Sequence, residues 1–255
     1  MTGWTALLLA GSRPGGDPLT RSFGTDYKPL IPIEGEPMLL RPLRALLASS
    51  SVAEVRVLTQ QPGRLRDVLP ADPRVRLEQS EPTIAATLEG ICADPRAPFP
   101  ILVTTADHAL LTPRMVESFI AASSGCDICV AFVESRPLLA RFPDAQRTWL
   151  RFGKGRYSGA NLFALNTPRA AVAIERWRAI EQDRKKGWRV LLQLGLPLFL
   201  GAVLRVRSLE QTALGLGRRL GITISPVVMD DPLAAIDVDK PADYSLVQAI
   251  IAGRA

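Results

Sequence analysis

The sequence has few of the residues that bind soft metals, with one histidine and three cysteines among 255 residues. Three cysteines are too few for a disulfide framework in a chain of this length. Cys126 and Cys129 have CxxC spacing, but they lie in DICVAFVE, which we expect to be a strand. An offset of three places two strand residues on opposite faces. We therefore interpret both as small buried hydrophobic side chains in a reducing cytosol, not as a metal or redox site.

The sequence also lacks an apolar run of the roughly 20 residues that a membrane-spanning helix needs. A strongly apolar stretch, residues 190–204, is 15 residues long and is interrupted by two glycines and a proline. We expect it to be a core element or a homodimer contact, while its basic flanks leave peripheral membrane contact as the alternative. The N-terminus has no basic segment before its short apolar run, so we predict no signal peptide and a cytoplasmic protein.

The composition excludes a disordered or fibrous chain, because 47% of the residues are hydrophobic and 22% are charged. The net charge of +6 comes from 31 basic and 25 acidic residues, a balance that suits an anionic ligand. The acidic residues dilute this charge too much to indicate nucleic-acid binding, and we expect no nucleic-acid partner. With no internal repeat or clear linker, we predict one domain over residues 1–255 with a less regular inserted segment at about 136–225.

Strand and helix patterns alternate along the chain, most regularly in the first half. We expect strands at 4–10, 52–59, 101–105, 127–134, 157–165, 222–229 and 235–238. We expect helices at 37–50, 83–94, 114–122, 167–181, 208–220 and 242–251, the first with a kink or late start at Pro42. This order predicts a three-layer α/β/α domain with a mixed, mostly parallel sheet. Ligands of such sheets bind at the carboxyl ends of the strands.

The loop after the first expected strand contains the strongest chemical signal. Its glycines allow backbone N–H groups to approach phosphate oxygens, and Arg13 and Lys28 add positive charge. The candidate nucleotide-binding residues here are Ala10, Gly11, Ser12, Gly15 and Gly16. The loop has neither the GK[ST] of a P-loop nor the GxGxxG of a dinucleotide site. A flexible loop with turn glycines is the alternative interpretation.

This block resembles the start of the MobA-like nucleotidyltransferases, which include many sugar-phosphate and alditol-phosphate nucleotidyltransferases. Their pattern is a strand, A-G-G-x-G-x-R, a variable loop, K-x-L and then G-x-P-[ML]. This chain has Ala10-Gly11, Arg13, Lys28-Pro29-Leu30 and Gly35-Glu36-Pro37-Met38. Ser12 stands where the family has its second glycine, and the pair Gly15-Gly16 is displaced.

Two further blocks carry the same resemblance. ILVTTADHALLTP is similar to the family's strand that ends in a metal-binding aspartate, here Asp107, and AIDVDKPADY is similar to its D-x-D-T-P-E-D segment, here with Asp237 and Asp239. The resemblance implies a nucleotidyltransferase fold and a Mg²⁺ site built from Asp107, Asp239 and the nearby Asp237. Magnesium typically uses only one or two carboxylates and leaves its other positions to water and phosphates. We expect Asp107 and Asp239 to approach each other at the carboxyl ends of the sheet.

Other residues in these blocks have competing interpretations. Thr83 lies where relatives contact the nucleotide base, but it would also cap the helix that follows. Asn161 and Gly159 are candidates for acceptor binding, with strand-end hydrogen bonding as the alternative for Asn161. His108, beside the proposed metal ligand, is interpreted as a surface or hydrogen-bonded turn residue in preference to a catalytic base.

The sequence therefore predicts a Mg²⁺-dependent nucleotidyltransferase that moves NMP from an NTP, with CTP slightly favoured, to a phosphorylated small molecule. The acceptor would be a sugar, alditol or lipid-headgroup phosphate, and pyrophosphate would be released. One alternative is a glycosyltransferase of related fold, although the Asp107 block lacks a preceding D-x-D and the Lys28 block is typical of triphosphate users. Another is a non-catalytic nucleotide-binding domain, which Ser12 favours and the retained Lys28 disfavours.

Overall fold

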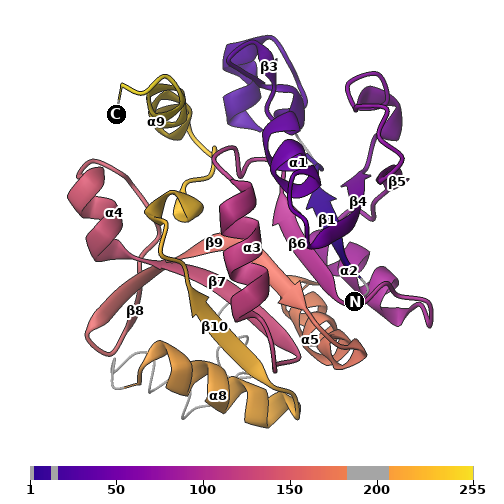
Figure 1. Ribbon diagram of the computed structural model, residues 1–255, viewed down its shortest axis with the longest axis vertical. Helices are drawn as coiled ribbons and strands as arrows, with labels where there is room; N and C mark the ends of the chain where they lie inside the picture. Colours follow the sequence, from indigo (N-terminus) through magenta and orange to yellow (C-terminus); the bar gives the residue numbers. More distant parts are fainter. Residues whose placement is uncertain (1–2, 13–16, 183–206, 255) are drawn as a thin grey trace.

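One eight-stranded sheet forms the centre of the molecule in the computed structural model, which describes residues 3–12, 17–182 and 207–254 (Figure 1). The strand order is β10-β7-β9-β6-β1-β4-β5, with β8 paired to β9. The strands are β1 (Trp4–Leu9), β4 (Val52–Thr59), β5 (Val75–Gln79), β6 (Ile101–Thr105), β7 (Ile128–Glu134), β8 (Leu150–Phe152), β9 (Gly155–Leu165) and β10 (Ile224–Val228). A separate hairpin joins β2 (Pro32–Ile33) to β3 (Glu36–Pro37).

Most neighbouring strands run parallel. β1 is parallel to both β4 and β6, β4 is parallel to β5, and β10 is parallel to β7. The exception is β9, which lies between β6 and β7 and is antiparallel to both. The predicted mixed, mostly parallel sheet is therefore confirmed, and the carboxyl ends of β1, β4 and β6 lie along one edge.

Helices cover both faces of the sheet. The α-helices are α1 (Leu40–Leu47), α2 (Ile84–Ala93), α3 (Pro113–Ala122), α4 (Ser135–Arg141), α5 (Ala171–Gln182), α8 (Leu209–Leu220) and α9 (Pro241–Ile251) (Figure 1). On β1, Leu8 packs into a core that includes Leu43 of α1, whereas the neighbouring Leu7 packs into a second core that includes Leu88 of α2. Alternate side chains of a strand face opposite sides, so the two cores give the predicted three layers.

Local capping chemistry explains why several helices begin where the sequence predicts. Thr83 and Thr112 accept hydrogen bonds from backbone N–H groups in the first turns of α2 and α3. Ser208 and Gln211 form the expected capping box at α8. Helix α1 starts late, at Leu40, which places Pro42 in the first turn, where its missing N–H costs no intrahelical bond.

The interpretation of the cysteine pair is wrong, because Cys126 and Cys129 form a disulfide with a Cα–Cα distance of 6.7 Å. Strand β7 begins only at Ile128, so Cys126 lies in the turn before it, next to Gly125, whose φ is +79°. The alternation rule for strands does not apply across that turn. Cys92 is the free cysteine, and it is buried.

The predicted strand at 235–238 is also wrong. A 3-10 helix, Pro232–Ala235, occupies its start and is capped by the Asp231 side chain, which accepts a hydrogen bond from Leu233 N–H. The chain then bonds to a loop instead of a strand, since Val238 N–H donates to the Asp107 carbonyl at 3.0 Å. The sequence analysis did not predict β5, β8 or α4, because their sequence patterns are weak.

Among the described residues, no helix combines the length and the hydropathy that crossing a membrane requires. The apolar stretch 190–204 lies outside the described residues.

Candidate active site

The predicted phosphate loop starts at the carboxyl end of β1. Its position is fixed from the neighbouring β4, because Gln60 Oε1 accepts a hydrogen bond from Ser12 N–H at 3.1 Å. A Cβ atom at Gly11 would lie 2.6 Å from the same oxygen, so a larger residue here would displace the Gln60 amide from its bond to Ser12. Ala10 N–H donates to the Leu58 carbonyl, which continues the pairing of β1 with β4. Arg13, Gly15 and Gly16 lie outside the described residues.

Lys28 is held close to this loop by the residue before it. Tyr27 is 1% exposed, and its hydroxyl donates to the Ala10 carbonyl at 3.1 Å. The same hydroxyl contacts Thr59 Oγ1 at the end of β4. Tyr27 therefore ties the start of a short 3-10 helix, Lys28–Leu30, to the carboxyl ends of two central strands.

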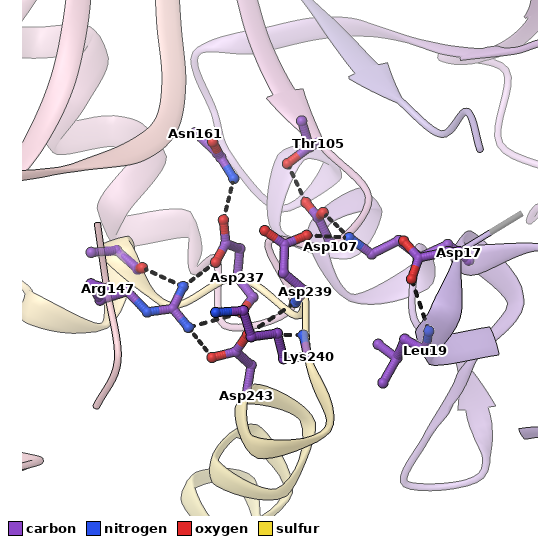
Figure 2. Close-up of polar contacts among 12 residues, drawn as sticks. Asp17, Leu19, Thr105, Asp107, Arg147, Asn161, Asp237, Asp239, Lys240 and Asp243 are labelled. Atoms are coloured by element: carbon purple, nitrogen blue, oxygen red, sulfur yellow. Dashed lines mark hydrogen bonds and ion pairs between the residues drawn. The ribbon is translucent and has the colours of Figure 1, made fainter. Parts of the chain in front are cut away.

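Two aspartates distant in sequence meet at the Lys28 ammonium. Lys28 Nζ lies 2.6 Å from Asp107 Oδ2 and 2.6 Å from Asp239 Oδ1. Figure 2 shows the side chains of Asp107 and Asp239 side by side at the carboxyl edge of the sheet. The predicted convergence of these two carboxylates is present in the structure.

Backbone contacts explain why the two aspartates meet. Asp107 lies in the turn after β6, and Thr105 Oγ1 donates to its Oδ1 at 2.5 Å. Its carbonyl accepts the Val238 N–H described above, which fixes the neighbouring Asp239 against the same turn. We call the three side chains of Lys28, Asp107 and Asp239 the lysine cluster.

The charges of the lysine cluster determine its protonation. Burial alone would lower the pKa of the Lys28 ammonium, but the charges of Asp107 and Asp239 outweigh burial and hold that pKa above its usual range. Lys28 therefore stays charged at neutral pH. Its side chain is 12% exposed, whereas that of Asp239 is 44% exposed, so the cluster opens toward solvent on the Asp239 side.

A second ionic cluster lies beside the first. Asp237 and Asp243 both form ion pairs with Arg147, and Asn161 Nδ2 donates to Asp237 Oδ2 at 2.9 Å (Figure 2). We call Arg147, Asp237 and Asp243 the arginine cluster. Burial, together with the charges of Asp107 and Asp239 and against that of Arg147, raises the pKa of the Asp237 carboxyl. Asp237, predicted as a third metal ligand, is thus near the lysine cluster but already bonded to Arg147 and Asn161.

Asn161 reaches Asp237 because the pairing of β9 is irregular at this point. Val130 of β7 pairs with Phe163, but Phe132 pairs with Gly159, so β9 contains extra residues between these two pairs. Asn161 has a φ of +47°, a conformation that asparagine tolerates better than most residues. Gly159 is exposed at the same irregularity.

A cavity of about 540 Å³ lies between the phosphate loop and the lysine cluster. Its volume is in the range of small-molecule sites. Apolar side chains of β1, β4 and α2 and polar groups both line it. The lining includes the apolar residues Leu9, Leu58 and Ile84, together with Gly11, Ser12, Asp17, Lys28, Gln60, Thr83, Asp107 and Asp239.

The remaining predicted residues have clear structural positions. Thr83 lines the cavity and also caps α2, so both of its interpretations fit the structure. His108 is fully buried, not at the surface, and its Nδ1 lies 3.3 Å from Thr104 Oγ1. Burial lowers the pKa of the His108 imidazole to about 4, so the ring is neutral at pH 7.

Several residues of this region were not predicted from the sequence, among them Gln60, Asp17 and Arg147. Gln60 directly follows β4, and its place at a strand's carboxyl end is a signal that could have identified it. Asp17 is buried in the cavity wall, where its carboxylate accepts the Leu19 N–H. Arg147 comes from an irregular segment between α4 and β8, where no sequence pattern predicts its partners.

Comparisons with known proteins agree with this architecture. A solved structure described as a hypothetical transferase from Thermus thermophilus is 25% identical, with a TM-score of 0.79 over 95% of this chain and 99% of that one. A CMP:2-keto-3-deoxy-manno-octonic acid synthetase complexed with CTP is 16% identical, with a TM-score of 0.60 over 99% of this chain and 100% of that one. No curated protein shows significant similarity to this sequence.

A 2-C-methyl-D-erythritol 4-phosphate cytidylyltransferase, also from Thermus thermophilus, has the same fold, with 15% identity and a TM-score of 0.54 over 98% of each chain. Similarity at this level of identity establishes the fold alone. The family match is more specific, because residues 6–217 match the MobA-like NTP transferase domain. That match contains the phosphate loop, Lys28 and Asp107, and it covers well over half of the sequence. The chain therefore belongs to the family of MobA-like NTP transferase domains.

Proposed function

We propose that this protein transfers NMP from an NTP, with CTP the slightly favoured nucleotide, to a phosphorylated small molecule. The observation that carries the proposal is the lysine cluster, which lines a cavity that also contains apolar side chains suited to a base and polar groups suited to a phosphate chain. Parallel sheets bind ligands at this edge. The family membership and the cytidylyltransferase fold of two neighbours support the same reaction class.

In the proposed reaction, a phosphate oxygen of the acceptor attacks the α-phosphorus of the NTP. A new P–O bond forms as the bond to the β-phosphate oxygen breaks, and pyrophosphate leaves with the electron pair. Both reactants are anionic, so positive charge near the phosphates stabilises the transition state. We assign this role to Lys28, together with Arg13, and the backbone N–H groups around Gly11 and Ser12 would bind phosphate oxygens.

The residues present fit a bound Mg²⁺ ion. Asp107 and Asp239 both lie 2.6 Å from one atom, so the two carboxylates are close enough to share a cation. No three metal-binding side chains gather around one point in the described part of the chain. Magnesium typically uses only one or two carboxylates, and we assign it Asp107 and Asp239. When bound, the ion would supply charge neutralisation at the phosphates. Asp107 and Asp239 would hold it, with Asp237 behind them.

We place the acceptor next to Asn161 and Gly159, at the irregularity of β9. Asn161 already orients Asp237 and presents a polar side chain on the side of the lysine cluster away from β4. An acceptor that already carries a phosphate is largely ionised at neutral pH, so it needs no strong base. The neutral, buried His108 is consistent with a reaction that does not use one.

Two measurements test the proposal. The first is a thermal-shift panel with CTP, GTP, UTP and ATP, each with Mg²⁺. Binding at 100 times Kd stabilises a protein by about 2.7 kcal/mol, which raises the melting temperature of a chain this size by about 5–10 °C. We expect one nucleotide to stand out. The second is pyrophosphate release when that nucleotide is mixed with sugar, alditol and headgroup phosphates.

The outcomes separate the alternatives. Pyrophosphate release that requires both substrates supports the transferase. No stabilisation by any NTP, with stabilisation when the panel is repeated with nucleotide-sugars, would favour a glycosyltransferase. NTP binding without turnover for any acceptor class would favour a non-catalytic nucleotide-binding domain and contradict the proposal.

A further inference from the structure

Among the described residues that form ion pairs near the site, Arg147 is the most deeply buried cation. The proposed reaction gives it no role. Its side chain is only 7% exposed, although it comes from an irregular segment between α4 and β8. It does not line the nucleotide cavity. A buried arginine costs desolvation free energy unless its hydrogen bonds are satisfied, so the partners of Arg147 indicate its purpose.

Within the described part of the chain, the two terminal nitrogens of Arg147 bond only to one segment, residues 235–243, while its Nε has no partner there. Nη1 donates to the Ala235 carbonyl at 3.3 Å and forms an ion pair with the Asp237 carboxylate. Nη2 donates to the Asp237 carbonyl at 3.4 Å and forms an ion pair with the Asp243 carboxylate. One guanidinium therefore connects the end of the 3-10 helix, the D-x-D segment and the first turn of α9.

The contact with Asp243 extends to the proposed metal ligand. Asp243 uses its other oxygen, Oδ2, to accept hydrogen bonds from the backbone N–H groups of Asp239 at 3.2 Å and Lys240 at 2.9 Å. Arg147 thus fixes the carboxylate that in turn fixes the backbone of Asp239 (Figure 2). On the other side, Val238 N–H attaches the same segment to the Asp107 turn.

We propose that Arg147 is a positioning residue, which acts through Asp243 and Asp237 to hold the Asp239 carboxylate where it can share a cation with Asp107. This inference rests on the proposed function, because it assigns Arg147 to the support of that metal site. Residues that orient metal ligands in this way typically change metal affinity by about tenfold to a hundredfold when they are substituted.

The chemistry of the guanidinium group fits this role better than that of an ammonium would. Arginine carries five N–H donors on a rigid plane, and here its two terminal nitrogens bond to two different carboxylates and two carbonyls. A lysine at this position would have three donors on a single nitrogen, which cannot satisfy two carboxylates and two carbonyls spread over a wider plane. Buried ion pairs often add little stability compared with apolar packing, so stability alone is a weak reason for this cluster.

The test measures Mn²⁺ binding by electron paramagnetic resonance, in the presence of the nucleotide that the thermal-shift panel selects. The variant is Arg147→Lys, and the matched control is Arg74→Lys. Arg74 also bonds to a carboxylate, that of Asp72, and to a backbone carbonyl, that of Leu47, but it lies at the other end of the sheet beside β5. Nucleotide binding in EDTA is measured for each protein by calorimetry.

For Arg147→Lys we expect Mn²⁺ affinity to fall by about tenfold to a hundredfold, with nucleotide affinity in EDTA changed less than threefold. The Arg74→Lys control should lower the melting temperature without changing Mn²⁺ affinity. Should Arg147→Lys not fold, Asp243→Asn serves instead, because an asparagine oxygen still accepts the Asp239 and Lys240 N–H groups while the ion pair with Arg147 is lost. We expect this variant to lose Mn²⁺ affinity in the same direction by a smaller factor.

Wild-type Mn²⁺ affinity in the folded variant, with only a lower melting temperature, would overturn the positioning role and make Arg147 a structural residue. That result differs from failure of the proposed function, which would appear in the wild-type protein itself, either as no binding of nucleotide and Mn²⁺ or as NTP binding without pyrophosphate release.

Discussion

The lysine cluster and the arginine cluster each place one cation between two aspartates, but they differ in exposure to solvent. Lys28 bonds to one oxygen each of Asp107 and Asp239 beside an open cavity, and Asp239 is 44% exposed. In the arginine cluster, Arg147 is 7% exposed and Asp243 is 8% exposed. A compact ammonium with single contacts can exchange partners, whereas a guanidinium with four contacts is fixed. This difference matches the two proposed roles, chemistry for the lysine cluster and support for the arginine cluster.

The largest expected effect comes from a carboxylate of the lysine cluster. Asp107→Asn keeps the size of the side chain but removes the charge that a divalent cation requires. We expect turnover to fall by at least about a thousandfold with the melting temperature nearly unchanged, since removal of one key electrostatic group costs about 10²–10³ and loss of the metal adds to it. The equivalent change at Asp239 should have a similar effect. Pyrophosphate release within tenfold of wild type would show that Asp107 does not hold the metal.

The next largest effect should follow removal of the lysine. Lys28→Met retains the length of the side chain but loses the charge that stabilises the transition state, so we expect kcat/KM to fall by about 10²–10³. Lys28→Arg should restore little activity, because a planar guanidinium does not replace a compact ammonium in a tight phosphate loop.

The same variant also tests whether Asp107 and Asp239 bind the metal. Without the ammonium, Asp107 and Asp239 repel each other, so Mn²⁺ alone should bind Lys28→Met at least as tightly as wild type. Weaker Mn²⁺ binding by Lys28→Met would argue that the two aspartates are not the metal ligands. Near-normal turnover by this variant would refute the assignment of Lys28.

A smaller effect is expected at the residue that anchors Lys28. Tyr27→Phe removes the hydroxyl that bonds to the Ala10 carbonyl and Thr59, and so leaves buried polar groups with fewer partners. We expect a loss of about 1–2 kcal/mol in the free energy of unfolding, and a severalfold loss of kcat. Chemical denaturation and initial rates measure the two effects. Unchanged stability with an unchanged rate would show that the hydroxyl does not hold the loop.

The smallest effect should come from Glu117, whose carboxylate lies far from both clusters, at the amino ends of the strands. Hydroxyl groups of Ser49 and Ser51 donate to Glu117 and, with the Ser51 N–H, lower the pKa of its carboxyl to about 2. Because the folded pKa is below its ordinary value of 4.5, this stabilisation is complete above pH 4.5 and is lost as the pH falls toward 2.

Glu117→Gln should therefore lower stability at pH 7 by only about 1 kcal/mol, because partial exposure weakens these bonds. The difference from wild type should disappear between pH 4.5 and about 2, as measured by urea unfolding at each pH. A difference that is constant with pH would show that the charge of Glu117 contributes nothing. Activity at neutral pH should not change in this variant.

The parts of the site that the sequence predicted lie on residues with strong local signals. Lys28, Asp107 and Asp239 belong to short motifs, and the rule that parallel strands present their carboxyl ends together predicted that the two aspartates would meet. Their convergence on one ammonium is present in the structure. Their chemical roles remain predictions for the experiments above.

The parts that the sequence did not predict depend on contacts between irregular segments. The cysteine pair was assigned to a strand because its neighbours are apolar, whereas the true boundary at Ile128 leaves Cys126 in a turn. Residues 235–238 have a strand-like pattern, but the 3-10 helix and the bond from Val238 to Asp107 take the chain away from the sheet.

Sequence patterns alone predicted the alternating elements, the helix caps at Thr83, Thr112 and Ser208, and the motifs of the nucleotide site. These features depend on side-chain periodicity, capping and turn geometry, which involve residues only a few positions apart and can be evaluated from the sequence. The bonds from Arg147 to Asp237 and Asp243 could be identified only in the folded structure, because they join residues that are 90 and 96 positions apart in the sequence. The physical reason is that burying a charge requires partners, and no local rule specifies which distant segments will supply them.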